Sequence, residues 1–301
     1  MINSLKSLLG LGSVPSNLGW TAADSRQTNS PIIILDIGCR WGFAERFLDH
    51  KYQRLMKIFG FDPDADECAR LQAAYGHLPK GFINCIPLAL AEKSGKRNLF
   101  VTKEPACSSL QPPIKHLSDE YPALKCIELD RVVSVNVENL GDWASKNGLR
   151  SLDYIKIDTQ GSELEILRGA GDYLLTTRCL DIEVEFNPIY EGQSLFWETD
   201  SYLRSKGFVI WRLSNLVHYS RGGELLELND TNTVCFDENV RQEAKAFGGQ
   251  LFWADARYVN SSIFSGNPVP ENAEFDRDLV LFEALGMHDV ERHIQEIRAR
   301  V

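Results

Sequence analysis

Short apolar runs alternate with segments of helical periodicity along the middle of the chain. The runs occupy residues 32–37, 56–61, 82–90, 152–157, 180–186 and 208–213. Nearly continuous apolar runs of this length are typical of strands that are buried on both faces of a parallel sheet. Segments between the runs repeat apolar positions every three to four residues, as amphipathic helices do. The alternation predicts an α/β fold with a doubly wound parallel sheet.

Two helices are predicted to begin at capping boxes, in which an Asp or Ser precedes a Glu by three residues. Asp64 with Glu67 and Ser162 with Glu165 fit this spacing. Shorter elements are expected between them: strands at 99–102 and 127–137 as antiparallel additions, and a helix from 140.

The pattern divides the chain into three regions. Residues 1–30 are expected to be an N-terminal extension, because 13–30 are rich in Ser, Asn, Thr, Gly and Pro and are typical of a linker. Residues 31–220 carry the alternating pattern and form the main domain. Residues 221–301 are less regular, with strand candidates at 233–236 and 251–259. We expect them to be an extension packed on the same domain, because the final helix has one apolar face, formed by Val290, Ile294, Ile297 and Val301.

Composition narrows the classes of partner. The chain has 301 residues, and 32 Lys and Arg against 42 Asp and Glu give a net charge of −10. No nucleic-acid partner is expected, since such binding depends on basic residues that contact phosphates. The seven cysteines include no C-x-x-C pair, which predicts reduced thiols and no metal site. No apolar stretch of about 18 residues occurs, so no membrane span is expected. We expect a cytoplasmic protein and leave a homodimer open.

Ligands of open α/β sheets bind beyond the carboxyl ends of the strands, near the point where the strand order reverses. The first candidate there is the motif D-x-G-x-x-x-G, with Asp36, Gly38, Arg40 and Gly42. The glycines allow a tight turn and a close approach of the backbone to a ligand. A dinucleotide fingerprint would have glycine in place of Arg40, so the motif favours a ligand without a pyrophosphate. The alternative is a plain strand-to-helix turn.

Acidic residues follow two further strands. Asp62 ends the second run, where a carboxylate can accept hydrogen bonds from both hydroxyls of a ribose. The alternative is that Asp62 or Asp64 only caps the next helix. Asp158 and Glu163 come after the run at 152–157 and are expected at the same crevice. For Glu163 the alternative is stabilisation of the helix dipole.

A third acidic group lies within the run at 180–186. Side chains alternate along a strand, so Glu183 and Glu185 point to the same side. Two carboxylates on one face of an interior strand are costly unless they are paired or bound. Glu185 and Asn187 are the better site candidates because they are nearer the carboxyl end. At a sheet edge, the glutamates would be solvated instead.

Together these motifs resemble the FkbM-type family of class I S-adenosylmethionine-dependent methyltransferases. The resemblance covers about residues 32–215. It depends on ILDIGCRWG (34–42), GFDPD (60–64), PLALAEKSG (87–95), CSSL (107–110), DYIKIDTQGSELEILRGA (153–170) and IEVEFNPIY (182–190). The chain departs from the family pattern at 139–142, which reads NLGD, and at Gln160, where many members have Glu.

The resemblance implies a Rossmann-like seven-strand methyltransferase sheet and S-adenosyl-L-methionine as the cofactor. It implies O-methylation of a hydroxyl on a small-molecule acceptor such as a sugar, glycan or polyketide-like compound. Carried over residue by residue, it assigns the methionine end to Asp36, Gly38 and Gly42. It assigns the ribose to Asp62, the adenine to Ala89 and Leu90, and the sulfonium and acceptor to Asp158. Arg40 and Pro63 are further cofactor-binding candidates.

An alcohol that attacks a methyl group needs a base. The hypothesis from the sequence is that Asp158 or Glu163 takes the proton, with Glu185 as a third candidate. Two alternatives stay open, a nicotinamide-dependent oxidoreductase and a non-catalytic nucleoside-binding scaffold. The P-loop, G-x-S-x-G and H-E-x-x-H motifs are absent from the sequence, which disfavours the hydrolase classes that they mark.

Overall fold

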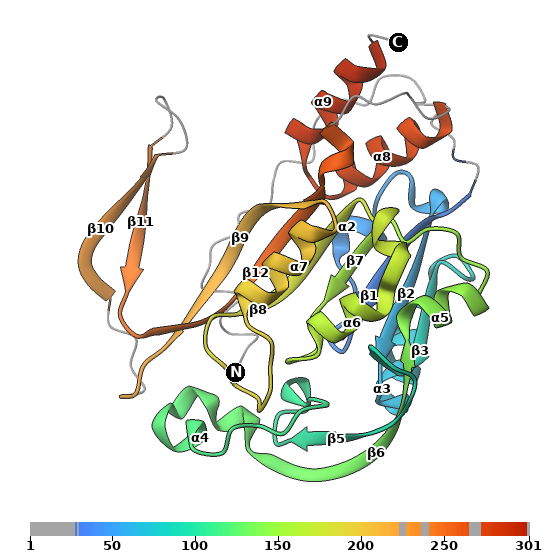
Figure 1. Cartoon of the computed structure of the whole chain (residues 1–301). Coiled ribbons are helices and arrows are strands. Elements are labelled where there is room, and N and C mark those ends of the chain that lie inside the picture. Colours follow the sequence, from blue (N-terminus) through green and yellow to red (C-terminus); the bar gives the residue numbers. More distant parts are fainter. Residues whose placement is uncertain (1–27, 29, 223–226, 236–240, 265–271, 300–301) are drawn as a thin grey trace.

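A seven-stranded sheet forms the centre of the molecule in the computed structural model, which describes residues 28, 30–222, 227–235, 241–264 and 272–299 (Figure 1). Its strand order is β3-β2-β1-β7-β8-β12-β9. The strands are β1 (Ile32–Ile37), β2 (Met56–Asp62), β3 (Ile83–Pro87), β7 (Tyr154–Ile157), β8 (Cys179–Glu185), β9 (Phe208–Tyr219) and β12 (Gln250–Asn260). This order confirms the doubly wound, Rossmann-like α/β fold that the sequence predicts.

One strand of the sheet departs from the expected parallel arrangement. β12 pairs antiparallel with both β8 and β9, while the pairs β3–β2, β2–β1, β1–β7 and β7–β8 are parallel. β12 comes from the region expected to be a C-terminal extension, so that region supplies a strand of the sheet itself. Its pairing with β8 has no register shift, with Asp255 opposite Glu183 and Arg257 opposite Asp181.

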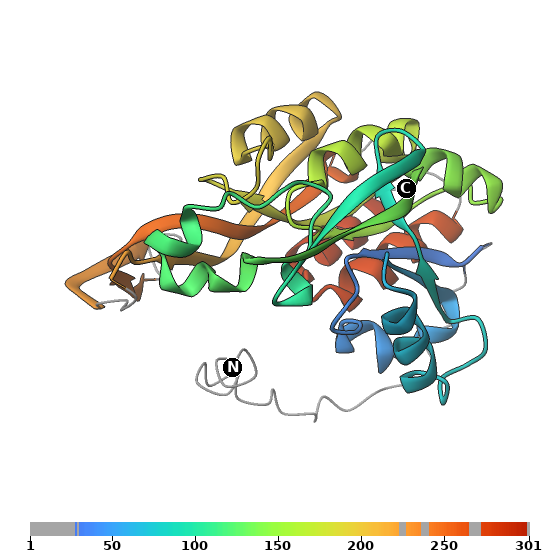
Figure 2. The same ribbon diagram turned by 90° about the horizontal axis from the view of Figure 1, so that it is seen from below.

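Helices cover both faces of the sheet (Figure 2). One face packs against α2 (Glu45–Leu48), α3 (Ala65–Ala74), α8 (Asn272–Ala284) and α9 (His288–Ala299). The other packs against α5 (Leu140–Lys146), α6 (Glu163–Ala170) and α7 (Phe196–Ser205). β1 shows the reason. Its side chains alternate between two apolar cores, Ile32 and Ile34 in the first and Ile33, Leu35 and Ile37 in the second.

Smaller elements extend from this body. The strands β4 (Ala89–Ala91), β6 (Leu129–Asn139) and β5 (Gly95–Thr102) form a separate sheet, in which β5 and β6 are antiparallel as expected. β10 (Glu227–Cys235) and β11 (Arg241–Phe247) form a two-stranded ribbon that projects to one side (Figure 1). The remaining helices are short: α4 (Leu117–Glu120), η1 (Gln53–Leu55), η2 (Pro105–Cys107), η3 (Pro122–Ile127), η4 (Gly171–Leu175) and η5 (Ser261–Phe264).

The run at 82–90 does not form the single strand that its apolar pattern predicts. β3 ends at Pro87, and β4 begins at Ala89 in the other sheet. The Leu88 amide donates to the Ile86 carbonyl at 2.8 Å, which turns the chain between the two strands. Apolar residues continue through the turn, although β3 is only partly buried and β4 is fully buried, so hydrophobicity alone cannot locate the break.

Only one of the two expected capping boxes has a capping side chain. Asp64 accepts hydrogen bonds from the Asp66 and Glu67 amides, and so it caps α3 as predicted. The Ser162 prediction is wrong, because its side chain makes no cap hydrogen bond and its hydroxyl is buried without a partner. Glu165 pairs with Arg97 instead, at 2.5 Å. The final helix α9 does bury Val290 and Ile294 as predicted, while Val301 and residues 1–27 and 29 of the predicted N-terminal extension lie outside the described residues.

A buried ion pair fastens α8 to the amino ends of β1 and β7. Arg277 donates to both carboxylate oxygens of Asp153, with Nε–Oδ1 at 2.5 Å and Nη2–Oδ2 at 2.6 Å. The guanidinium also donates to the backbone carbonyls of Ser30 and Pro31. Asp153 accepts a further bond from the Ile33 amide at 2.7 Å. The amino ends of β1 and β7, opposite the predicted site, are therefore covered by α8 and joined to it by this ion pair. Among the described helices none is long and apolar enough to cross a membrane.

Candidate active site

The loops that follow β1 and β7 meet where the strand order of the sheet reverses. β1 has β2 on one side and β7 on the other. Gly38 has a φ of +88°, and a Cβ at this position would lie 1.9 Å from the Asp158 carbonyl oxygen. Only glycine leaves room for that approach. The two motifs that the sequence places after separate strands are therefore in direct backbone contact at the predicted crevice.

A single ammonium group links the acids that follow these two strands. Lys156 Nζ lies 3.2 Å from Asp36 Oδ1 and 3.4 Å from Asp158 Oδ2. Burial raises the pKa of the Asp36 carboxyl, and Lys156 opposes that rise. Although burial opposes it, the two carboxylates raise the pKa of Lys156. Asp36 is almost fully buried, whereas the Asp158 side chain is 41% exposed, so Asp158 is the accessible member of the group.

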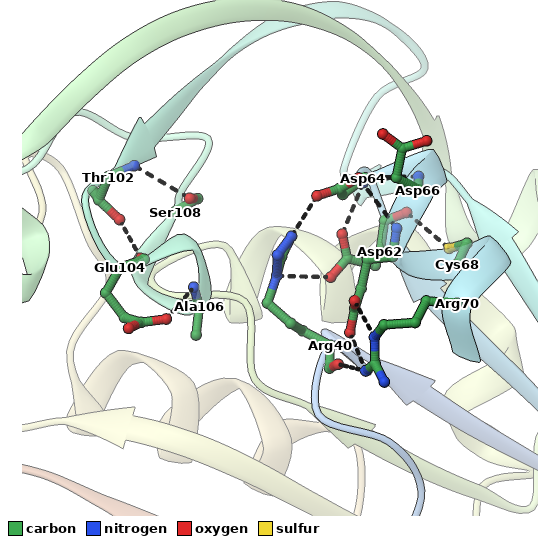
Figure 3. Close-up of polar contacts among 11 residues, drawn as sticks. Arg40, Asp62, Asp64, Asp66, Cys68, Arg70, Thr102, Glu104, Ala106 and Ser108 are labelled. Atoms are coloured by element: carbon green, nitrogen blue, oxygen red, sulfur yellow. Dashed lines mark hydrogen bonds and ion pairs between the residues drawn. The ribbon is translucent and has the colours of Figure 1, made fainter. Parts of the chain in front are cut away.

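Asp62 lies at the end of β2 with its carboxylate directed at the loop after β1 (Figure 3). Its Oδ1 accepts from the Asp64 amide at 2.8 Å, and its Oδ2 lies 3.6 Å from Arg40 Nε. Arg40 donates more closely to Asp64, with Nη2–Oδ2 at 2.6 Å. Burial raises the pKa of the Asp62 carboxyl, while the Asp64 amide and Arg40 lower it. Asp64 caps the helix, as the sequence predicts, and Asp62 Oδ2 keeps capacity for a hydroxyl donor.

The residues assigned to the adenine lie beside Asp62. Asp62 is in register with Pro87 of β3, and Ala89 and Leu90 begin β4 just beyond. Both are buried, and Leu90 belongs to the core that also contains Phe61. Pro63 is half-buried in the turn between β2 and α3. The cofactor candidates of the first three strands are thus neighbours in space.

Glu163 holds the loop after β7 and is fully engaged in doing so. Its carboxylate accepts from the Thr159 amide at 2.8 Å, the Thr159 hydroxyl at 3.0 Å, and the Gly161 amide at 2.9 Å. Burial raises the pKa of Glu163, and the loop amides lower it. Glu163 is 3% exposed. The arrangement favours a role in shaping the loop over contact with an acceptor.

Two further acids lie on β8 beside this loop. Glu183 Oε2 accepts from Gln160 Nε2 at 2.7 Å. Burial and then the neighbouring carboxylates raise the pKa values of Glu183 and Glu185 well above the ordinary range. Asn187 donates to the Leu251 carbonyl at 2.7 Å and so ties the end of β8 to β12. Of the three, Glu183 is the one joined to the Asp158 loop, although the sequence analysis preferred Glu185 and Asn187.

Sequence reasoning also gave no role to Lys156 and Gln160, the two side chains that connect the acids. A lysine inside an otherwise apolar run was a usable signal, because a buried cation on a central strand needs carboxylate partners. Gln160 gave no such signal, since its position depends on a left-handed backbone conformation with φ +60°. In the part of the chain that the structure describes, the His, Cys, Asp and Glu side chains form no cluster arranged to hold a metal ion.

Comparison with known families places the chain. The model of the Methyltransferase FkbM domain matches residues 30–210. The chain therefore belongs to the FkbM methyltransferase family. It is 33% identical over 169 residues to the 2-O-methyltransferase NoeI of Sinorhizobium fredii (strain NBRC 101917 / NGR234). That match covers 54% of this chain and 66% of the relative, which is just under two thirds of the relative's length.

Solved structures give only distant matches. A precorrin-6y C5,15-methyltransferase from Geobacter metallireducens GS-15 aligns with 76% of this chain and 82% of its own, at 10% identity and a TM-score of 0.32. A Streptococcus pneumoniae protein, Sp1610, described as a putative tRNA (m1A22) methyltransferase, aligns over 89% and 93%, at 12% identity and a TM-score of 0.34. At these scores, the fold assignment rests on the sheet order described above.

Proposed function

We propose that this protein is an S-adenosylmethionine-dependent O-methyltransferase whose acceptor is a hydroxyl of a sugar, glycan or polyketide-like molecule. The observation that carries the proposal is the contact between Gly38 and Asp158. It joins a glycine turn to an accessible carboxylate at the point of the sheet where ligands bind. Membership of the FkbM family supports methyl transfer, and the similarity to the 2-O-methyltransferase NoeI supports an oxygen acceptor.

The residues present fit the cofactor. An amino acid ammonium and ribose hydroxyls are hydrogen-bond donors, and the carboxylates of Asp36 and Asp62 are acceptors at the ends of adjacent strands. Gly38 and Gly42 both have positive φ, so the backbone between these acids can turn closely around a ligand. The chain at Ala89 and Leu90 would lie beside the base, with the Leu90 side chain in the core beneath it. When bound, S-adenosylmethionine supplies an electrophilic methyl group.

The chain's own residues then position the acceptor and receive its proton. Holding two reacting groups in line supplies much of the rate effect of such a displacement. Asp158 is the best-placed base, because its side chain is 41% exposed, with Lys156 Nζ 3.4 Å from Oδ2 and the Gln160 amide donating to Oδ1. Glu163 is less suited, because its side chain is buried and an acceptor hydroxyl cannot reach its carboxylate.

The deciding experiment is a binding measurement followed by a transfer assay. Isothermal calorimetry should give saturable heat for S-adenosylmethionine and for S-adenosylhomocysteine, and no heat for NAD. Radiolabelled donor should then label neutral sugars, glycans or hydroxylated polyketides, and Asp158→Asn should abolish the label while retaining the heat. Heat for NAD alone would favour an oxidoreductase. Nucleoside binding without transfer to any acceptor would favour a scaffold. A homodimer, a cytoplasmic location and the lack of a nucleic-acid partner stay predictions.

A further inference from the structure

Gln160 occupies an unusual backbone position between two carboxylates. Its φ is +60°, in the left-handed region, which residues other than glycine rarely adopt. The Gln160 carbonyl accepts from the Ser109 hydroxyl at 2.6 Å, and Glu163 holds the amides of the two flanking residues. Hydrogen bonds on both sides therefore maintain a conformation that the residue would not adopt by itself. Strain of this kind tends to be retained at functional sites.

The conformation places the side-chain amide where it bridges two acids. Gln160 Nε2 donates to Asp158 Oδ1 at 3.1 Å and to Glu183 Oε2 at 2.7 Å. The opposite orientation of the amide would direct its oxygen at both carboxylates. On the other side, Gln160 Oε1 lies 3.3 Å from the Tyr190 hydroxyl, which also donates to the Cys107 carbonyl at 2.6 Å. One NH₂ group thus holds together two carboxylates from different strands.

The ionisable groups around this bridge are mostly acidic. Burial, followed by the charges of Asp158, Glu185 and Glu163, raises the pKa of Glu183. A glutamate at position 160 would bring a third carboxyl into the same contacts. The titratable and charged groups that face the bridge come from β1, β7, α6, β8, β12 and the loops beside them: Asp36, Lys156, Asp158, Glu163, Glu183, Glu185, Asp255, Tyr190 and Cys107.

We propose that Gln160 is a positioning residue that holds Asp158 and Glu183 as one hydrogen-bonded pair and keeps that pair ready to take the acceptor's proton. Asp158 touches the reacting hydroxyl, and Glu183 acts on Asp158 through the Gln160 amide. This inference rests on the proposed function, because it assumes that Asp158 is the base. It goes beyond the family assignment in giving roles to Gln160 and Glu183.

The test compares substitutions of similar shape in the full-length chain. Gln160→Glu adds a charge, and Gln160→Met removes both hydrogen bonds without adding a charge. Gln295→Glu, on the exposed face of α9, is the matched control for the added charge. Two readouts are used: carbon-13 titration of the Asp and Glu carboxyl groups, which needs no acceptor, and the pH profile of kcat/KM with labelled donor.

We expect the carboxyl titration of Asp158 and Glu183 to move to higher pH by about one unit in Gln160→Glu, which corresponds to a tenfold loss of kcat/KM on the acidic limb. Activity should recover at high pH, and cofactor affinity should change little. A Gln160→Glu variant with unshifted carboxyl titrations overturns the proposal. An equal loss at every pH, with a lower Tm, overturns it in favour of a purely structural role. If no acceptor is methylated and no nucleoside binds, the proposed function fails, while the carbon-13 arm still decides whether Gln160 couples the two acids.

Discussion

Gly38 packs so closely against the backbone carbonyl of Asp158 that a Cβ atom at position 38 would lie 1.9 Å from the carbonyl oxygen. The Asp158 amide in turn donates to the Ile37 carbonyl at 3.0 Å. Through this contact the end of β1 and the end of β7 behave as one structural unit. The cofactor candidates that follow β1 are thereby held close to Asp158, the candidate base that follows β7.

Replacing Gly38 by Ala should separate the two loops or prevent folding. Both the positive φ and the overlap with a backbone atom oppose a side chain here, and backbone cannot move aside as a flexible side chain can. The control is Gly81→Ala, at φ +80° with open space around the new Cβ, where only the backbone strain of about 1–2 kcal/mol applies. Thermal melts and calorimetry with S-adenosylmethionine measure the difference. Equal behaviour of the two variants would show that the Gly38 contact is not required.

Asp62→Ala should weaken the binding of S-adenosylmethionine by about ten- to a hundredfold, because a charge-assisted hydrogen bond to ribose contributes roughly 1.5–3 kcal/mol. Asp64→Ala is the control. It removes the cap of α3 and should cost about 1 kcal/mol of folding stability with a smaller effect on affinity. Calorimetric dissociation constants for both variants test the assignment. An unchanged constant for Asp62→Ala would remove this residue from the ribose site.

Asp158→Asn and Glu163→Gln should fail in different ways. Asp158→Asn should lower kcat by about 10²–10⁴-fold, the usual contribution of a general base, with near-normal cofactor affinity. Glu163→Gln should instead lower the Tm. The carboxylate accepts hydrogen bonds from loop donors at both of its oxygens, and the NH₂ group of a glutamine would face some of these donors without being able to accept from them. Single-turnover rates and thermal melts on the same samples separate the two. A stable Glu163→Gln enzyme that has lost its chemical step would reverse the roles.

Arg277→Met should cost about 3–5 kcal/mol of folding free energy, because it leaves the Asp153 carboxylate buried without its cation. Arg298→Met removes the surface pair with Asp276, where Arg298 is 40% exposed, and should cost less than about 1 kcal/mol. Urea unfolding curves of the two variants give the comparison. Similar midpoints would mean that the Arg277 pair adds no more than a surface pair.

Glu185→Gln should stabilise the fold above pH 5 and have little effect near pH 4. Burial, followed by the charges of Glu163 and Asp158, raises the pKa of Glu185 above the ordinary value of 4.5. The folded state therefore binds more protons than the unfolded state in this window, and the free energy of unfolding falls as pH rises. A gain of about 1 kcal/mol would raise Tm by roughly 2–4 °C. Thermal melts from pH 4 to 8 measure the difference in Tm between the variant and the wild type. Glu191→Gln, at an exposed position, is the control. A gain in Tm that does not depend on pH would contradict the assigned cause.

The sequence by itself determined the parts that depend on local pattern. Apolar runs gave the parallel strands β1, β2, β7 and β8, because a strand buried on both faces can contain little else. The D-x-G-x-x-x-G spacing and Asp62 gave the cofactor candidates, since chemistry in this fold collects at strand ends. The Asp64 cap also followed from its spacing to Glu67, because capping is a contact between near neighbours in the chain.

Only the tertiary structure decided how distant residues share the site. The antiparallel insertion of β12 between β8 and β9 is a long-range pairing that no local pattern specifies. The capping box at Ser162 failed because the Ser162 hydroxyl is buried without a partner and Glu165 pairs with Arg97, which lies in a distant strand. Lys156 and Gln160 acquire their partners from other strands, 120 and 23 residues away in the chain. The sequence identifies the candidate polar side chains. The fold decides which of them are in contact, because hydrogen bonds and ion pairs form between residues that are close in space, whatever their distance along the chain.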